Sequence, residues 1–109
     1  MAASIVSGTL DLLILKTLAA GSMHGYGIAS HIKRLSRDAL RIEEGSLYPA
    51  LQRMKVKGWV ASEWKTSPTG RKARYYKLTA AGRRQLGQET EDFNESIAAI
   101  SRVLRSAES

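Results

Sequence analysis

Residues 46–78, SLYPALQRMKVKGWVASEWKTSPTGRKARYYKL, contain one short amphipathic segment followed by two strand-like segments. Leu47, Leu51 and Met54 recur at intervals of four and three residues. This spacing predicts a helix over 46–57 whose apolar side chains form a single inward-facing stripe. The polar residues between them would then face solvent.

The ends of this predicted helix carry residues that suit helix termini. Ser46 is a good N-cap, and Pro49 would then fall in the first turn, where its missing N–H breaks no helical hydrogen bond. Gly58 suits the position just after the last turn. We therefore expect the helix to begin at Ser46.

Two strands are expected after this helix, at 59–66 and 73–78. In the first strand, positions 60, 62 and 64 (Val, Ser, Trp) alternate with positions 61, 63 and 65 (Ala, Glu, Lys). The second strand is rich in aromatic residues, with Tyr75 and Tyr76. Ser67, Pro68, Thr69 and Gly70 between them are turn-forming residues. The sequence thus predicts a β-hairpin with a basic tip.

Two further helices are expected before this stretch. The segment 9–20 has apolar residues most of the way round, which predicts one side against its own core and another against a second subunit. A glycine-spaced turn at 24–27 leads into a helix over 26–36, and Leu40 and Ile42 suggest a short strand.

A long last helix is expected from a Thr79 cap to about Arg105. Six of its residues are spaced 4, 3, 4, 3 and 4 apart, which is the heptad pattern of a helix–helix seam: Leu86, Thr90, Phe93, Ile97, Ile100 and Leu104. At 1.5 Å per residue this helix reaches roughly 40 Å, more than the preceding body can cover. The predicted dimer interface is therefore Leu10, Leu13, Leu86, Phe93, Ile97, Ile100 and Leu104.

Three helices followed by a basic hairpin, in that order, define a fold class. We predict a mainly α (α+β) chain, a winged helix-turn-helix with a two-stranded β wing and a long C-terminal helix. The expected domains are 1–78, a DNA-binding winged helix-turn-helix, and 79–109, a C-terminal dimerisation helix.

The charge is unevenly distributed. The formal net charge is +7, and residues 53–84 hold ten Lys and Arg against the single acid Glu63. From residue 88 onward there are five acids against two arginines. A concentrated cationic block indicates a polyanionic partner, although a solvated basic surface is the alternative.

The outward face of the 46–57 helix carries the residue types that read DNA. A major groove about 12 Å wide admits one α-helix. The outward residues predicted to contact DNA are Ser46, Tyr48, Pro49, Gln52 and Arg53. Gln52 can pair with adenine, and Arg53 with guanine or a phosphate. Tyr48 has the alternative of packing on a neighbouring helix.

The hairpin adds a second group of predicted DNA contacts. Four cations surround its turn: Lys65, Arg71, Lys72 and Arg74. Cations so placed can touch phosphates or enter the minor groove beside the recognition helix. The expected partners are therefore double-stranded DNA with a near-palindromic operator and a second copy of the chain.

Other functional classes find little support in the sequence. There is no cysteine, the two histidines have no companion ligand motif, and no phosphate-binding loop occurs, so we expect no enzyme, metal site or cofactor. No apolar run could span a bilayer, and the first residues lack the pattern of a signal peptide, so we expect a cytoplasmic protein. A basic RNA-binding or protein-interaction winged helix remains the alternative function.

Four motifs occur in unbroken order: GTLDLLIL at 8–15, HGYGI at 24–28, EGSLYPAL at 44–51 and RYYKLTAAG at 74–82. Together they resemble the PadR family of bacterial transcription regulators over about residues 8–86. The resemblance implies a winged-helix DNA-binding domain, dimerisation through the first and last helices, and repression released by a small-molecule effector.

The resemblance also assigns roles by position. Tyr48 and the wing residues Arg71, Lys72 and Arg74 match the family's DNA-contacting positions. The short tail resembles the compact branch of the family, with one C-terminal helix. Some compact members stack planar drugs on a tryptophan of that helix, whereas here Phe93 is its only aromatic residue. The binding of planar drugs by the same means is therefore not expected.

Overall fold

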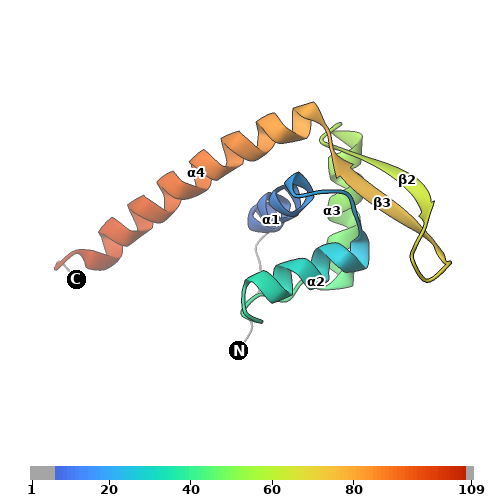
Figure 1. The fold of residues 1–109 in the computed structure, drawn as a ribbon. Helices are drawn as coiled ribbons and strands as arrows, with labels where there is room; N and C mark the ends of the chain where they lie inside the picture. The colour runs from blue at the N-terminus through green and yellow to red at the C-terminus, as the bar shows by residue number, and fades with distance from the viewer. Residues whose placement is uncertain (1–6, 108–109) are drawn as a thin grey trace.

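The computed structural model describes residues 7–107, which form four helices and a three-stranded antiparallel sheet. The elements are α1 (Ser7–Ala19), β1 (Met23–His24), α2 (Gly25–Leu35), α3 (Glu44–Val56), β2 (Val60–Thr66), β3 (Lys72–Leu78) and α4 (Ala80–Arg105). In Figure 1, α1, α2 and α3 form one body, the β2–β3 hairpin projects from its side, and α4 runs across and beyond it. The predicted winged helix-turn-helix is confirmed.

The predicted domains extend slightly past the described region at both ends. Residues 1–6 and 108–109 lie outside the described residues. The expected lack of a signal peptide concerns residues 1–6 and therefore stays a prediction. Within 7–107, no helix is both long and apolar enough to cross a membrane.

The hydrophobic core lies where the three helices meet the base of the hairpin. It takes side chains from every one of these elements: Leu10, Ile14, Leu15 and Leu18, Ile28 and Ile32, Leu47, Ala50, Leu51 and Met54, and Val60, Tyr76 and Leu78. The predicted stripe of α3 is confirmed, because Leu47, Leu51 and Met54 are each no more than 1% exposed. Burying this stripe fixes the rotation of α3 about its axis and turns its polar face to solvent.

The first turn of α3 differs from the prediction. The helix begins at Glu44, with Glu43 as an N-cap that makes no side-chain capping bond, so the prediction of Ser46 as N-cap is wrong. The amide of Ser46 already donates to the Glu43 carbonyl at 3.0 Å, and the Glu44 carboxylate is favourably placed in the positive first turn. Pro49 consequently lies inside the helix, where one backbone hydrogen bond is lost.

The hairpin forms as predicted and gains a third strand. Its register runs from Val60 opposite Leu78 to Thr66 opposite Lys72. The two residues of β1 pair with β3 at Tyr75 and Tyr76, so β3 is the central strand. Two residues are too few to show a periodic pattern, which is why β1 was not predicted. The short strand expected around residue 40 is reduced to one isolated bridge residue.

The start of α4 is tied to the backbone at the end of α3. Thr79 is the N-cap, as predicted: its Oγ1 accepts the Gly82 amide at 3.0 Å and lies 2.6 Å from the Gly58 carbonyl oxygen. Gly82 packs so closely that a Cβ there would lie 2.1 Å from the carbonyl oxygen of Trp59. Only glycine fits this approach.

The apolar residues of α1 are not divided between the core and a second subunit in the way that the sequence predicted. Leu10 was predicted to face a second subunit, but its side chain is 5% exposed within the core of its own chain. Leu13 is half-buried and packs against the same core. Leu10 therefore leaves the predicted dimer surface, because the three-helix body buries more of α1 than expected.

We expect Gly82→Ala to lower the free energy of unfolding by about 2 kcal/mol, because the added methyl group must push the first turn of α4 away from Trp59. Urea denaturation at fixed protein concentration measures this. Gly87→Ala, in the same helix with nothing within 4 Å, is the matched control and should stabilise by up to about 1 kcal/mol. Equal effects of the two substitutions would contradict the close approach.

Candidate nucleic-acid interface

The outward face of α3 carries the residues that the sequence assigned to it. All five predicted contact residues are exposed: Ser46, Tyr48, Pro49, Gln52 and Arg53. They share the side of α3 opposite its buried stripe and come mostly from its N-terminal half. The structure thus leaves this part of α3 open to a partner.

Tyr48 both packs on a neighbouring helix and stays accessible. Its ring lies against Gly25, the first residue of α2, so that a Cβ at Gly25 would lie 2.7 Å from the Tyr48 hydroxyl oxygen. The side chain is nevertheless 43% exposed. Gly25 is a packing position that sequence reasoning did not single out, although it belongs to the glycine-spaced turn at 24–27.

A cleft of about 640 Å³ joins the start of α2, Tyr48 and the hairpin. Its walls include Arg71, Lys72 and Arg74, together with the turn residues Ser67, Pro68 and Thr69. The structure therefore brings Tyr48 and three of the four predicted wing cations to one concave surface. Within residues 7–107 these three cations form no ion pair.

Lys65 stands apart from the other wing cations. Strand alternation puts it on the opposite face of the hairpin from Arg74 and Lys72. Its Nζ lies 3.3 Å from a carboxylate oxygen of Glu63 and 5.5 Å from the ring centre of Tyr75. Its charge is thus partly neutralised within the hairpin.

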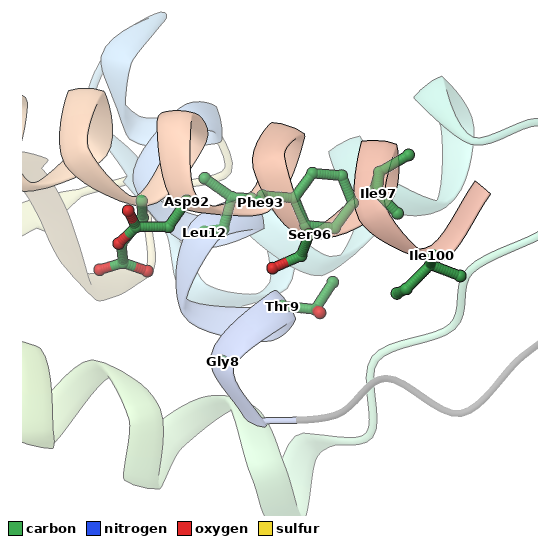
Figure 2. Close-up of a pocket in the computed structure, with 9 residues that line it drawn as sticks. Gly8, Thr9, Leu12, Asp92, Phe93, Ser96, Ile97 and Ile100 are labelled. Atoms are coloured by element: carbon green, nitrogen blue, oxygen red, sulfur yellow. The ribbon is translucent and has the colours of Figure 1, made fainter. Parts of the chain in front are cut away.

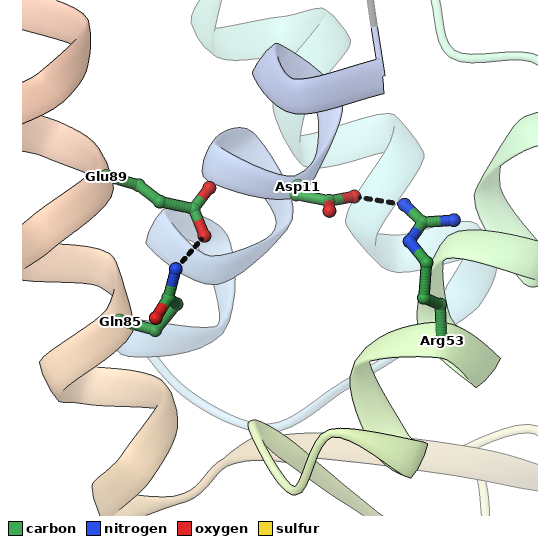
Figure 3. A network of polar contacts seen from close by, with 4 residues as sticks. All are labelled: Asp11, Arg53, Gln85 and Glu89. Atoms are coloured by element: carbon green, nitrogen blue, oxygen red, sulfur yellow. Dashed lines mark hydrogen bonds and ion pairs between the residues drawn. The ribbon is translucent and has the colours of Figure 1, made fainter.

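Arg53 has an ion-pair partner that the sequence did not reveal. Its Nη2 donates to Oδ1 of Asp11 on α1 at 2.6 Å (Figure 3). The Arg53 side chain is 42% exposed and that of Asp11 is 13% exposed. The pair ties α3 to α1 and uses one of the two terminal nitrogens of the Arg53 guanidinium. The 42-residue separation explains why no local pattern could show this contact.

The floor of the cleft includes a buried phenol. Burial raises the pKa of Tyr76 above its ordinary value of 10.0, with the Arg74 cation opposing this shift and Tyr48 adding to it. The fold therefore favours the neutral phenol, and this contribution to stability is present below pH 10 and lost as the pH rises through the higher folded-state pKa. At neutral pH the hydroxyl carries no charge that would repel a polyanion.

A second concave surface lies between α1 and α4. It encloses about 460 Å³ and is lined by Gly8, Thr9, Leu12, Glu89, Asp92, Phe93, Ser96, Ile97 and Ile100. Figure 2 shows the α4 side chains Phe93, Ile97 and Ile100 along this groove, with Leu12 and Thr9 of α1 on its other side. Leu12, which the predicted interface omitted, lines this groove, whereas Leu10 does not.

Possible ligands for a metal ion do not gather anywhere in the described part of the chain. Over residues 7–107, no group of three or more His, Cys, Asp or Glu side chains could hold one.

The comparison with known proteins agrees with this fold. The model of the "Transcriptional regulator PadR-like family" matches residues 14–88, more than half of the chain. The chain belongs to the PadR family. A relative in Mycobacterium tuberculosis, the transcriptional regulator Rv3488, is 34% identical over 84 residues, which are 77% of this chain and 75% of the relative.

Solved structures of PadR-like regulators share the architecture. A transcriptional regulator from Clostridium thermocellum has a TM-score of 0.80 and 27% identity, covering 87% of this chain and 92% of its own. A PadR family regulator from Clostridium difficile has a TM-score of 0.73 and 27% identity, covering 87% and 97%. This PadR protein is thus a DNA-binding winged-helix regulator of transcription, from a family of regulators and not of enzymes.

We expect the Asp11–Arg53 pair to contribute about 1 kcal/mol to folding, since one partner is mostly buried and the other is partly screened by water. A double-mutant cycle with Asp11→Asn and Arg53→Gln, measured by urea denaturation, gives this coupling directly. The more exposed Glu63–Lys65 pair is the matched control and should show a smaller coupling. A coupling of zero between Asp11 and Arg53 would mean that the pair does not form in solution.

Proposed function

We propose that this PadR protein is a homodimeric repressor that binds a near-palindromic site on double-stranded DNA. The observation that carries the proposal is the cleft shared by Tyr48, Arg71, Lys72 and Arg74, next to the exposed face of α3. In this arrangement α3 enters the major groove while the unpaired wing cations bind backbone phosphates.

Within this proposal the residues of α3 have different tasks. Gln52 and Ser46 are exposed, and their side chains make no hydrogen bond or ion pair within the described chain, so both can meet base edges. Gln52 can form a bidentate pair with adenine. Arg53 holds α3 against α1 through its Nη2 and Asp11, and its remaining N–H donors are available to a guanine or a phosphate.

The dimer is proposed to form along the exposed apolar face of α4. Phe93, Ile97, Ile100 and Leu104 are between 39% and 79% exposed, whereas Leu86 already packs on the core. Such a stripe on a 26-residue helix is unfavourable in water until a second helix covers it. A two-fold axis there would set the two α3 helices about 34 Å apart, one turn of DNA.

Repression then follows from occupancy of a promoter by the dimer. A small-molecule effector lodged in the groove between α1 and α4 would change the tilt or spacing of the two α3 helices. Such an effector must bind the DNA-free arrangement more tightly than the DNA-bound one, because only differential affinity shifts an equilibrium.

The alternative of RNA recognition finds less support. Sheet-based RNA readers need several exposed aromatic side chains. Here Tyr76 is buried and Trp59 and Tyr75 are half-buried, so Trp64 alone of these four is exposed and the sheet offers no continuous platform. Duplex RNA in excess should therefore compete poorly with an operator.

Selection of duplexes from a random DNA library with the purified protein tests the proposal. We expect an enriched near-palindrome, with log affinity falling against log salt at a slope near about −7 if the dimer neutralises about eight phosphates. Fluorescence anisotropy at several stated salt concentrations measures the slope. A slope near about −1 or −2, or no enrichment, would contradict DNA recognition through this surface.

We expect Phe93→Asp to make the protein monomeric at micromolar concentration, because it places a charge within the apolar stripe of α4. Sedimentation velocity measures the mass. Ala99→Asp is the matched control, since it adds the same charge to an exposed position of the same helix away from the stripe. A Phe93→Asp protein that stays dimeric would show that α4 pairs in another way.

A further inference from the structure

Trp64 is a large apolar side chain left open on the hairpin. It lies on β2 and is 63% exposed, whereas Trp59, the other tryptophan, packs against the core. Its indole N–H donates to no acceptor among residues 7–107. Neither core packing nor internal hydrogen bonding therefore accounts for a tryptophan at this position.

Strand alternation determines which way Trp64 faces. Side chains at positions 60, 62 and 64 share one face of the hairpin with those of their partners 78, 76 and 74. At the base of the hairpin this face buries Val60, Tyr76 and Leu78 against the helices. Trp64 lies on the same face further out, where the helical body no longer covers it.

Arg74 connects Trp64 to the cleft beside α3. It is the cross-strand partner of Trp64, and its guanidinium carbon lies 5.1 Å from the centre of the indole ring. Arg74 also lines the cleft together with Tyr48. Its Nε is buried without a hydrogen-bond partner, and its charge is not paired with any carboxylate of the described chain.

We propose that Trp64 and Arg74 together form a clamp for the DNA backbone on the side of the wing, in addition to the contacts at its tip. In this clamp the indole N–H and the guanidinium donate to phosphate oxygens of one strand, and the ring covers the adjoining deoxyribose. The inference rests on the proposed function and adds Trp64, which the sequence did not assign to DNA, to its contact surface.

The charges around Trp64 favour DNA over a protein partner. A shallow hollow beside its ring is lined by Thr66 and Lys72 on the same face and by Lys65, whose charge Glu63 partly neutralises, and Arg74 lies across the strand pair. The nearest acid along the strand, Glu63, is on the opposite face and is paired with Lys65. The helix α4, where a second copy is proposed to pair, runs away from the wing in Figure 1. A polyanion therefore fits this patch best.

The test uses the full chain and the duplex obtained by selection. Trp59→Phe leaves Trp64 as the only tryptophan, so acrylamide quenching reports on that side chain alone. If Trp59→Phe does not fold, the difference between wild type and Trp64→Phe gives the same signal. We expect the duplex to shield Trp64 from acrylamide, and Trp64→Ala to bind about tenfold more weakly per subunit, because a charge-assisted hydrogen bond and its packing are lost.

Two further variants separate a DNA contact from a structural role. Arg74→Lys keeps the charge but loses the flat stacking surface, so we expect it to weaken binding with an unchanged unfolding midpoint. Leu35→Ala removes a side chain that is 68% exposed at the far end of α2 and should leave affinity unchanged.

The outcomes distinguish this inference from the proposed function. If the wild type binds the selected duplex while Trp64 stays fully open to acrylamide and Trp64→Ala binds normally, the clamp is overturned and DNA recognition stands. If no duplex is enriched, both fail. Shielding of Trp64 with a matching loss of affinity establishes the clamp.

Discussion

The close approach of Gly82 to the backbone of Trp59 is the contact on which the rest of the arrangement depends. The chain leaves β3, is capped by Thr79, and enters α4 with its first turn pressed against the residues that end α3 and begin β2. There is no room for a side chain at this contact, so α4 can leave the body in one direction only. The contact therefore sets where the exposed stripe of α4 lies relative to the wing and α3.

The helix α1 links the two functional surfaces. One side of it reaches α3 through Asp11 and Arg53, while the other lines the groove of α4 through Leu12 and Thr9 (Figures 2 and 3). A change in the shape of that groove would therefore displace α1, the helix that contacts α3. Coupling of this kind requires a packed element in contact with both sites, and α1 is such an element.

The surface proposed to face DNA combines the outward side of α3, whose orientation is set by packing, with the cations of the wing. Burial of Leu47, Leu51 and Met54 sets which residues of α3 face outward, and the contact of Tyr48 with Gly25 sets the position of α3 against α2. The wing then supplies charge that no carboxylate of the described chain neutralises. Tyr48 of α3 and the cations of the wing thus line one cleft. Recognition of a DNA groove flanked by phosphates requires both a fitting surface and positive charge.

The sequence by itself determined the four helices and the β2–β3 hairpin, the buried stripe of α3, the Thr79 cap and the basic tip of the wing, because each depends on neighbours within a few residues. It also indicated the exposed stripe of α4, since heptad spacing is a local pattern. Only the tertiary structure decided that Arg53 is held by Asp11, and that Leu10 is buried and Leu12 is not. These features depend on which distant segments pack together, and packing across tens of residues leaves no periodic trace in the sequence.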